Sequence, residues 1–327
     1  MKLFPVRRTN VIVSRSIAAL AGKFSSHSRT RQFILQYQKQ LMILPAMIFL
    51  IVFAYIPMYG IIIAFKNYKA SKGIWGSEWV GLQHFKLLID SSFLEVVIRN
   101  TLKISVTSLL LVFPAPIILA LLLNELRSAK FKRVVQTISY LPHFVSWVIV
   151  AGMFYNLLSA DGLINNLLIA FGFQQEAQIF LAKSENFLPL VILTSIWKEI
   201  GWESIIILAA LTAVDPEMHE AATIDGAGRL KRAWHISIPT ILPTIVILFI
   251  FALSNLLSSN FDQIYLLQNP SIIEASETID TYAFKVGISQ GQFDYGTAVG
   301  LLKAVIGFAL LLIANRTVRK LTSHGLW

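Results

Sequence analysis

The chain has 327 residues, a formal net charge of +10 and no cysteine, and 55% of its residues are hydrophobic whereas only 14% are charged. Ordinary soluble domains carry roughly a quarter charged residues, so this composition indicates a membrane protein. Without cysteine, the chain cannot form disulfides, use a thiol nucleophile or bind a metal through thiolates.

The first 40 residues contain eight Lys and Arg, several Ser and Thr, and no Asp or Glu. Organellar transit peptides have this composition. A bacterial cytoplasmic arm that lies on anionic lipid fits equally well, with apolar contacts from Val11, Ile12, Val13, Ile17 and Leu20. A cleaved secretory signal is not expected, because the first long apolar stretch begins near Leu41 and is long enough to span.

Six apolar stretches are long enough to cross a bilayer core, which needs about 20 mainly apolar residues per helix. They run from Leu41 to Phe65, Ile98 to Leu123, Val134 to Leu158, Leu188 to Val214, Thr240 to Ser258 and Gly296 to Ala314. These runs are continuous and lack the alternation that a β-barrel requires. The sequence therefore predicts an all-α integral membrane protein with six transmembrane helices.

The basic residues predict how these spans are oriented. The N-terminal tail has 8 Lys and Arg, the loop at 124–133 has 4, the loop after the fourth span has 3 and the C-terminal tail has 3, together 18 of the 28 in the chain. With six spans all four segments lie on one side, and positive charge marks the cytoplasmic side. Both termini are expected in the cytoplasm, and the net charge reports topology rather than nucleic-acid binding.

The loop after the fourth span contains Glu220-Ala221-Ala222, Asp225-Gly226-Ala227 and Ile236-Ser237-Ile238-Pro239. Asp215 can cap a helix that has Pro216 at its first position. Gly226 suits the end of that helix, because glycine accepts a left-handed conformation. We predict one short helix from about Pro216 to Asp225 and a second from about Gly228 to Ile238.

The spacing of this loop resembles the EAA motif of permease subunits in binding-protein-dependent ABC importers. The one departure is Ile238, where that family usually has Leu. The resemblance implies a coupling helix that sits in a cleft of a cytoplasmic ATPase, with Glu220 as the charged contact and Gly226 as the turn. It implies coupling roles for Glu220, Ala221, Ala222, Asp225, Gly226, Ala227 and Pro239. The alternative is an ordinary helical turn between two spans, since Asp-Gly is a common turn dipeptide.

Three further segments resemble the polysaccharide-permease branch of the maltose-transporter-like family. They are Tyr55 to Gly60 with Asn67-Tyr68, Trp79 to Phe85, and Tyr140 to Phe144. With the EAA loop, the resemblance covers most of the chain from about residue 40 onward. That family is mainly prokaryotic, so we favour the cytoplasmic arm over the transit peptide for residues 1–40.

Polar residues inside the spans are the candidates for a substrate path, because such groups are costly in lipid and usually face a bundle interior or a wet cavity. Glu199 and Glu203 share a face of the fourth span, and Lys198 lies beside them. Sugar-binding sites combine aromatic rings, which cover the apolar face of a pyranose ring, with groups that hydrogen-bond to its hydroxyls. The candidates are Tyr155, Trp197, Lys198, Glu199, Trp202, Glu203, Asn255, Asn260 and Lys303. The alternative is that the tryptophans are packing residues and that Lys198 and Glu199 form a structural pair with a second permease subunit.

Two other features predict helix shape and packing. Gly296, Gly300, Ala304 and Gly307 form a smooth surface where another helix can approach closely. Pro114 and Pro116 predict a kink in the second span.

The resemblance implies a non-enzymatic permease subunit for an oligo- or polysaccharide, in a bacterial cytoplasmic membrane. We expect a basic arm (1–40), a transmembrane domain (41–317) with a coupling loop (214–239), and a cytoplasmic tail (318–327). No phosphate loop of the form G-x-x-x-x-G-K-[ST] occurs, so ATP and Mg are expected on the partner ATPase. No metal or other cofactor is expected on this chain.

The partners implied by the resemblance are a second homologous permease, an ATPase dimer, an extracytoplasmic solute-binding protein, lipids and a saccharide. Two other classes of function stay open from the residues alone. One is a secondary transporter or channel in which Lys198, Glu199 and Glu203 relay ions or protons, although no inverted repeat is evident. The other is a membrane scaffold, which would tolerate loss of these three charges.

Overall fold

The computed structural model describes residues 37, 40–258 and 260–322. The expected N-terminal arm and its five apolar contacts lie outside the described residues. The chain divides into two units, Met1–Ile61 and Ile62–Trp327. A long helix, Gln40–Phe65, contains a π turn η1 (Ile51–Tyr55), a short α2 (Ile56–Met58) and a 3-10 turn η2 (Tyr59–Phe65). The irregular turns surround Pro57, which has no N–H for the helical ladder.

A small hairpin follows this helix in the second unit. Strand β1 (Lys66–Asn67) pairs antiparallel with β2 (Glu78–Trp79), and α3 (Gly73–Gly76) lies between them. Lys66 is buried, and its Nζ atom donates to the carbonyl of Ile74 at 2.7 Å. This hydrogen bond ties β1 to the segment between the two strands. The hairpin leads into α4 (Gln83–Ile89).

The second predicted span is a kinked pair of helices, α5 (Ser92–Leu111) and α6 (Pro114–Asn124). Pro114 occupies the first position of α6, where its missing N–H is tolerated, and the chain turns at residues 112–113. The kink predicted from Pro114 and Pro116 is confirmed.

The third predicted span, Val134 to Leu158, is not one helix. It is divided into α7 (Ala129–Tyr140), a 3-10 turn η3 (Leu141–Phe144) and α8 (Trp147–Leu158), which α9 (Leu163–Ala170) follows. Val145 and Ser146 are extended, and the Ser146 hydroxyl caps α8. Pro142 and this cap break the helix. The single span was predicted because its apolar residues run on across this break.

The longest helix of the middle region is α10 (Ser184–Leu211), which follows the short η4 (Phe180–Ala182). It packs against α6, α7, η3 and α13. A cluster of buried side chains joins α10 to α5, α8 and the segment after α13, and it includes Ile104, Ala151, Val191 and Ile264. A second cluster joins α6, α10 and α13 through Ala120, Ile207 and Ile241. These clusters hold α10 at the centre of the second unit.

The predicted motif helix is α11 (Pro216–Ile224). The second predicted helix begins after Gly228 but does not end at Ile238. Instead, α12 (Arg229–Arg232), a π turn η5 (Ala233–Ser237) and α13 (Ile238–Ser254) run on without a break. Pro239 lies in the first turn of α13, after the π turn, so it does not stop the helix.

Several short helices connect α13 to the last helix. They are α14 (Phe261–Leu267), η6 (Pro270–Ile272), α15 (Ile273–Ser276), α16 (Ile279–Phe284) and the π turn η7 (Lys285–Ser289). The last helix, α17 (Phe293–Thr322), packs against α13 and α16. Gly296 allows α17 to approach η7 closely, because a Cβ at Gly296 would lie 2.5 Å from the Cα atom of Gly287 in that turn.

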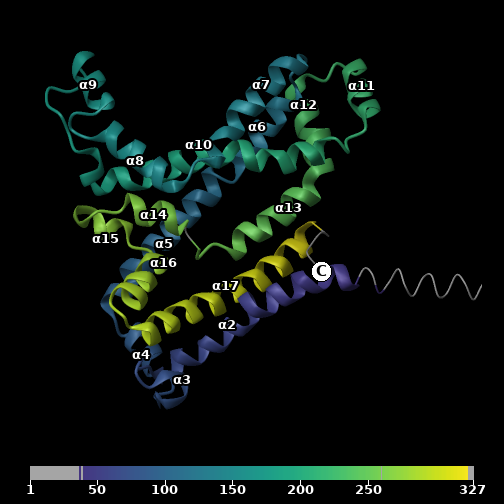
Figure 1. Ribbon diagram of the computed structural model, residues 1–327. Helices are drawn as coiled ribbons and strands as arrows, with labels where there is room; N and C mark the ends of the chain where they lie inside the picture. Colours follow the sequence, from purple (N-terminus) through teal and green to yellow (C-terminus); the bar gives the residue numbers. More distant parts are fainter. Residues whose placement is uncertain (1–36, 38–39, 259, 323–327) are drawn as a thin grey trace, which may run out of the picture. The chain divides into compact units, whose positions relative to one another are not determined.

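Five helical stretches in the described part of the chain are long and apolar enough to cross a membrane: Gln40–Phe65, Phe93–Asn124, Trp147–Ala170, Arg229–Ser254 and Phe293–Lys320. The protein is therefore an all-α, multi-pass membrane protein (Figure 1). Helix α10 is not among the five, because Lys198, Glu199 and Glu203 place three charged residues near its middle.

Candidate functional site

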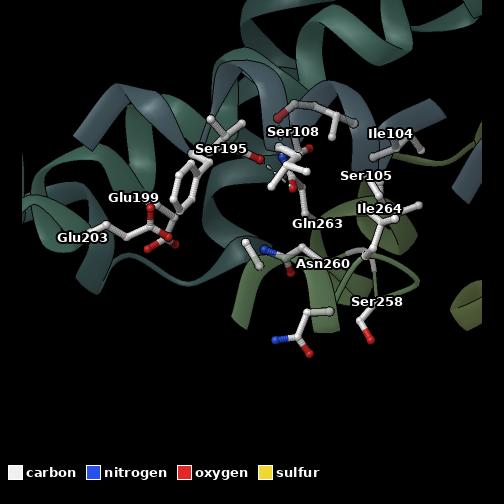
Figure 2. A pocket seen from close by; sticks show the side chains of 17 residues that line it. Ile104, Ser105, Ser108, Ser195, Glu199, Glu203, Ser258, Asn260, Gln263 and Ile264 are labelled. Atoms are coloured by element: carbon white, nitrogen blue, oxygen red, sulfur yellow. Dashed lines mark hydrogen bonds between the residues drawn. The ribbon is translucent and has the colours of Figure 1, made fainter. Parts of the chain in front are cut away.

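A pocket of about 260 Å³ lies between α5, α10, the end of α13 and the start of α14. Nine of its lining residues are polar: Ser105, Ser108, Ser195, Glu199, Glu203, Asn255, Ser258, Asn260 and Gln263. The rest are apolar, such as Ile104 and Ile264. Figure 2 shows these side chains around the opening. The pocket offers hydroxyl, amide and carboxylate groups within an otherwise apolar helix bundle.

Helix α10 supplies a polar row to this pocket. Ser195, Glu199 and Glu203 follow one another at intervals of four residues, so they share one face of the helix. The structure brings Glu199 and Glu203 together with Asn255 and Asn260, all four of which were predicted as path residues. Their contact with a substrate remains a prediction.

Gln263 fixes one wall of the pocket. It is 1% exposed, and its Nε2 atom donates to the Val191 carbonyl at 2.8 Å and to Thr194 Oγ1 at 2.7 Å. Its Oε1 atom accepts from Ser195 Oγ at 3.0 Å. A buried amide with all these bonds is held in a single orientation. Gln263 thereby fixes the position of the Ser195 hydroxyl at the pocket wall.

Glu199 belongs to a compact polar cluster. Its Oε2 atom lies 2.6 Å from His143 Nδ1, and its Oε1 atom lies 3.5 Å from Lys198 Nζ. The His143 ring stacks on Trp202 with a centroid distance of 4.4 Å and an interplanar angle of 2°. These contacts fix the Glu199 carboxylate at the pocket, where His143 is hydrogen-bonded to it and Lys198 offsets its charge.

Lys198 does not line the pocket. It is 5% exposed, its Nζ atom donates to the His143 carbonyl at 2.5 Å, and the same atom lies 5.5 Å from the centroid of Trp147. A cation in such a setting stabilises the packing of α10 on η3 and α8. Within the described part of the chain, Lys198 is therefore paired with Glu199 and packed against η3 and α8.

The other predicted path residues lie elsewhere. Trp197 packs edge-on against Phe154 with a centroid distance of 6.4 Å. The Tyr155 hydroxyl donates to the carbonyls of Leu267 and Gln268 at 3.4 and 3.3 Å. Trp202 lines a neighbouring apolar pocket that shares Glu203 and Asn255 with the first pocket. None of these three aromatic residues lines the pocket that contains Glu199.

Lys303 lies in a different pocket from Glu199, beside Gly300, Ala304 and Gly307. It forms an ion pair with Asp280, and this pair neutralises its charge. Lys303 is therefore held by a protein carboxylate.

Sequence reasoning missed five pocket residues, Ser105, Ser108, Ser195, Ser258 and Gln263, and the cluster residue His143. Polarity within a span was the available signal for Ser105, Ser108 and Ser195, but serine is too common there to stand out. His143 is 56 positions from Glu199, so no local pattern linked them. Among residues 40–258 and 260–322, no three His, Asp or Glu side chains gather as a metal site requires.

The motif loop adopts the predicted local structure. Asp215 Oδ1 accepts from the Glu217 backbone N–H at 2.9 Å, as expected for the cap of α11. Gly226 has φ +77°, and the Ala227 N–H donates to the Ala222 carbonyl at 2.8 Å to close the helix end. Glu220 is exposed, and the apolar side chains of Ile224 and Leu230 are each 87% exposed. The loop thus presents both charged and apolar groups at its surface.

Comparison with known proteins identifies the family. Residues 112–323 match the family described as "Binding-protein-dependent transport system inner membrane component". The chain is 47% identical over 308 residues to the polygalacturonan/rhamnogalacturonan transport system permease protein YteP of Bacillus subtilis (strain 168), covering 93% of this chain and 95% of YteP. It is 44% identical over 289 residues to Protein LplB of the same organism, covering 88% of this chain and 90% of LplB.

Solved structures agree with these relatives. A chain of a bacterial alginate ABC transporter, in complex with an alginate pentasaccharide-bound periplasmic protein, matches with a TM-score of 0.82 and 38% identity. The match covers 90% of this chain and 99% of that chain. These similarities support the importer over a secondary transporter or channel with a relay of midspan charges. The chain belongs to the inner membrane components of binding-protein-dependent transport systems and is a permease of an ABC importer.

Proposed function

We propose that this permease forms half of the translocation path for an oligo- or polysaccharide that an extracytoplasmic binding protein delivers. The observation that carries the proposal is the pocket in which Glu199, Glu203, Asn255 and Asn260 meet the serine hydroxyls. Hydroxyl, amide and carboxylate groups can replace the hydrogen bonds that a sugar makes with water. The names of the relatives, which are permeases for polygalacturonan or rhamnogalacturonan and for alginate, support a saccharide.

In this proposal α10 is the fourth of six spans. Its 28 residues reach about 42 Å at 1.5 Å per residue, more than a bilayer core of about 30 Å requires. Its charged residues are not exposed to lipid alone, since Glu199 and Glu203 line a pocket and Lys198 is paired. Six spans place both termini and α11 in the cytoplasm, with residues 1–40 and 318–327 as the flanking segments.

We also propose that α11 couples transport to ATP hydrolysis on a separate ATPase dimer, which binds ATP and Mg. Exposed Glu220, Ile224 and Leu230 supply a charged contact and apolar contacts for the ATPase cleft. A second homologous permease completes the path, and closure of the ATPase dimer shifts the spans between outward-open and inward-open states.

The test is gentle purification of the tagged chain from its native membranes, followed by mass spectrometry of the co-purifying polypeptides. We expect a second permease and an ATPase, with less ATPase bound to the Glu220→Ala variant. An associated binding protein would give its own ligand as the candidate substrate. If a preparation shown to preserve membrane complexes contained this chain alone, the proposed assembly would be wrong.

A further inference from the structure

Two arginines of α12, the segment that continues into α13, face the end of α6. The Arg232 Nη2 atom lies 3.7 Å from Glu125 Oε2, and the Arg229 Nε atom lies 3.8 Å from the same oxygen. Glu125 is the residue that caps the C-terminal end of α6. The two arginines differ in their surroundings, because the Arg232 side chain is 19% exposed and the Arg229 side chain is 59% exposed.

Arg232 also reaches the motif helix. Its Nη1 atom donates to Thr223 Oγ1 in the last turn of α11. Arg229 has no such bond among the described residues, so only Arg232 holds both α6 and α11. The Arg232 Nε atom is buried and makes no hydrogen bond in the described part of the chain. The guanidinium therefore lies between the two helices rather than in solvent.

Neighbouring contacts define a small joint around Arg232. His219 Nε2, on α11, lies 3.5 Å from Ser237 Oγ at the end of the π turn η5. Glu125, His219, Glu220 and Arg232 line one pocket. Figure 1 shows α11 and α12 at the same end of the second unit as α6. The predicted ATPase contact, Glu220, thus lies beside the arginine that binds α6.

The π turn lies directly after Arg232, at residues Ala233–Ser237. Such turns interrupt the regular helical ladder and often mark functional positions. The π turn thus separates α12, which carries Arg232, from the regular part of α13. A half-buried arginine with two partners is a more persistent contact than an exposed ion pair, which contributes about 0–1 kcal/mol.

We infer that Arg232 is a positioning residue that joins the motif helix α11 to the end of α6. A displacement of α11 is then passed to the second span through Glu125, as well as to the fifth span through the chain. The contact itself is independent of any partner. Its role in transport rests on the proposed function, in which an ATPase displaces α11.

Hydrogen exchange of the purified full chain in nanodiscs tests the contact without any partner. Arg232→Gln should raise the exchange rates of the α11 amides about fivefold to tenfold, as loss of a coupling contact predicts. Arg229→Gln is the matched control, since it removes a partner of the same carboxylate and should change these rates less than about twofold. Equal effects of the two variants, or no effect of Arg232→Gln, would overturn the inference.

Exchange of the two charges distinguishes loss of the contact from misfolding of a single variant. Glu125→Arg and Arg232→Glu each place like charges together, whereas the double variant restores an opposite pair. The double variant should recover slower exchange in α11 than either single variant. If it exchanges as fast as the single variants, the Glu125 contact does not position α11.

The role in transport is tested in the assembled complex, using spin labels at Glu217→Cys on α11 and Ile118→Cys on α6. The natural chain contains no other cysteine. On addition of ATP with orthovanadate, the distance between the labels should stay constant in the parent complex and change when Arg232→Gln is added. An equal change in both complexes would overturn the role. If no ATPase co-purifies, the proposed function fails, and the exchange experiment still decides the contact.

Discussion

Glu199 and Glu203 lie one helical turn apart on α10, yet their surroundings differ. Glu199 is hydrogen-bonded to His143 and lies 3.5 Å from Lys198. Glu203 has no ion pair among the described residues, and it lines two adjoining pockets. At residue scale, one carboxylate therefore supports the structure around the pocket, whereas the other is available to a ligand or a partner.

Replacement of glutamate by glutamine should therefore have different effects at these two positions. Glu199→Gln should lower the free energy of unfolding by about 1–3 kcal/mol, because it leaves the buried Lys198 ammonium without its anion and weakens the hydrogen bond to His143. Glu203→Gln should reduce transport at a nearly unchanged unfolding temperature. Tryptophan fluorescence during heating and uptake by cells, at matched membrane levels, measure the two effects. Equal loss of thermal stability in both variants would contradict the assignment.

Gly226 has φ +77°, and the space around it is open. Gly226→Asp should therefore cost only about 1 kcal/mol of local strain while it displaces the end of α11 and lowers transport. Gly228 is a suitable control, since it is also surrounded by open space but has φ −68°. Gly228→Ala should transport normally. Membrane abundance and uptake are the measurements, and normal uptake by Gly226→Asp would count against coupling through α11.

At the scale of elements, α10 is positioned by one close contact with α7. A Cβ at Gly201 would lie 2.0 Å from the Ser139 carbonyl oxygen, so the two backbones nearly touch. The break at Pro142 then turns the chain so that η3 places His143 beside Glu199. The geometry of the pocket thus depends on a small residue and on a proline that interrupts the third span.

The contact predicts that Gly201→Ala destabilises the protein by about 1–3 kcal/mol, as overpacking does. Gly152 on α8 has no atom within 4 Å of an added Cβ, so Gly152→Ala should be neutral or slightly stabilising. Thermal unfolding in detergent compares the two variants. A Gly201→Ala variant as stable as Gly152→Ala would show that α7 and α10 do not meet here.

At the scale of the whole chain, the side of the membrane on which each loop lies depends on whether α10 crosses. Gln175 and Leu230 are exposed positions on either side of α10. With six spans they lie on opposite sides, whereas with α10 outside the bilayer they lie on the same side.

The cysteine-free chain makes this test direct. An impermeant maleimide should label Gln175→Cys in spheroplasts or protoplasts, whose cytoplasmic membrane is intact and accessible to the reagent. It should label Leu230→Cys only after the membrane is opened, and full labelling after denaturation controls for burial under a partner. Labelling of both positions in intact cells would exclude α10 as a span.

The sequence by itself determined the membrane class, the cap and turn of α11, the kink at Pro114 and the family. Each depends on composition, on short-range hydrogen bonds or on a motif of fixed spacing, all of which are local. Only the tertiary structure decided that Lys198 and Lys303 are paired, that Tyr155 and Trp197 pack elsewhere, and that Gln263 and His143 shape the site. Those contacts join residues far apart in the chain, and their distances arise only when packed helices bring the side chains together.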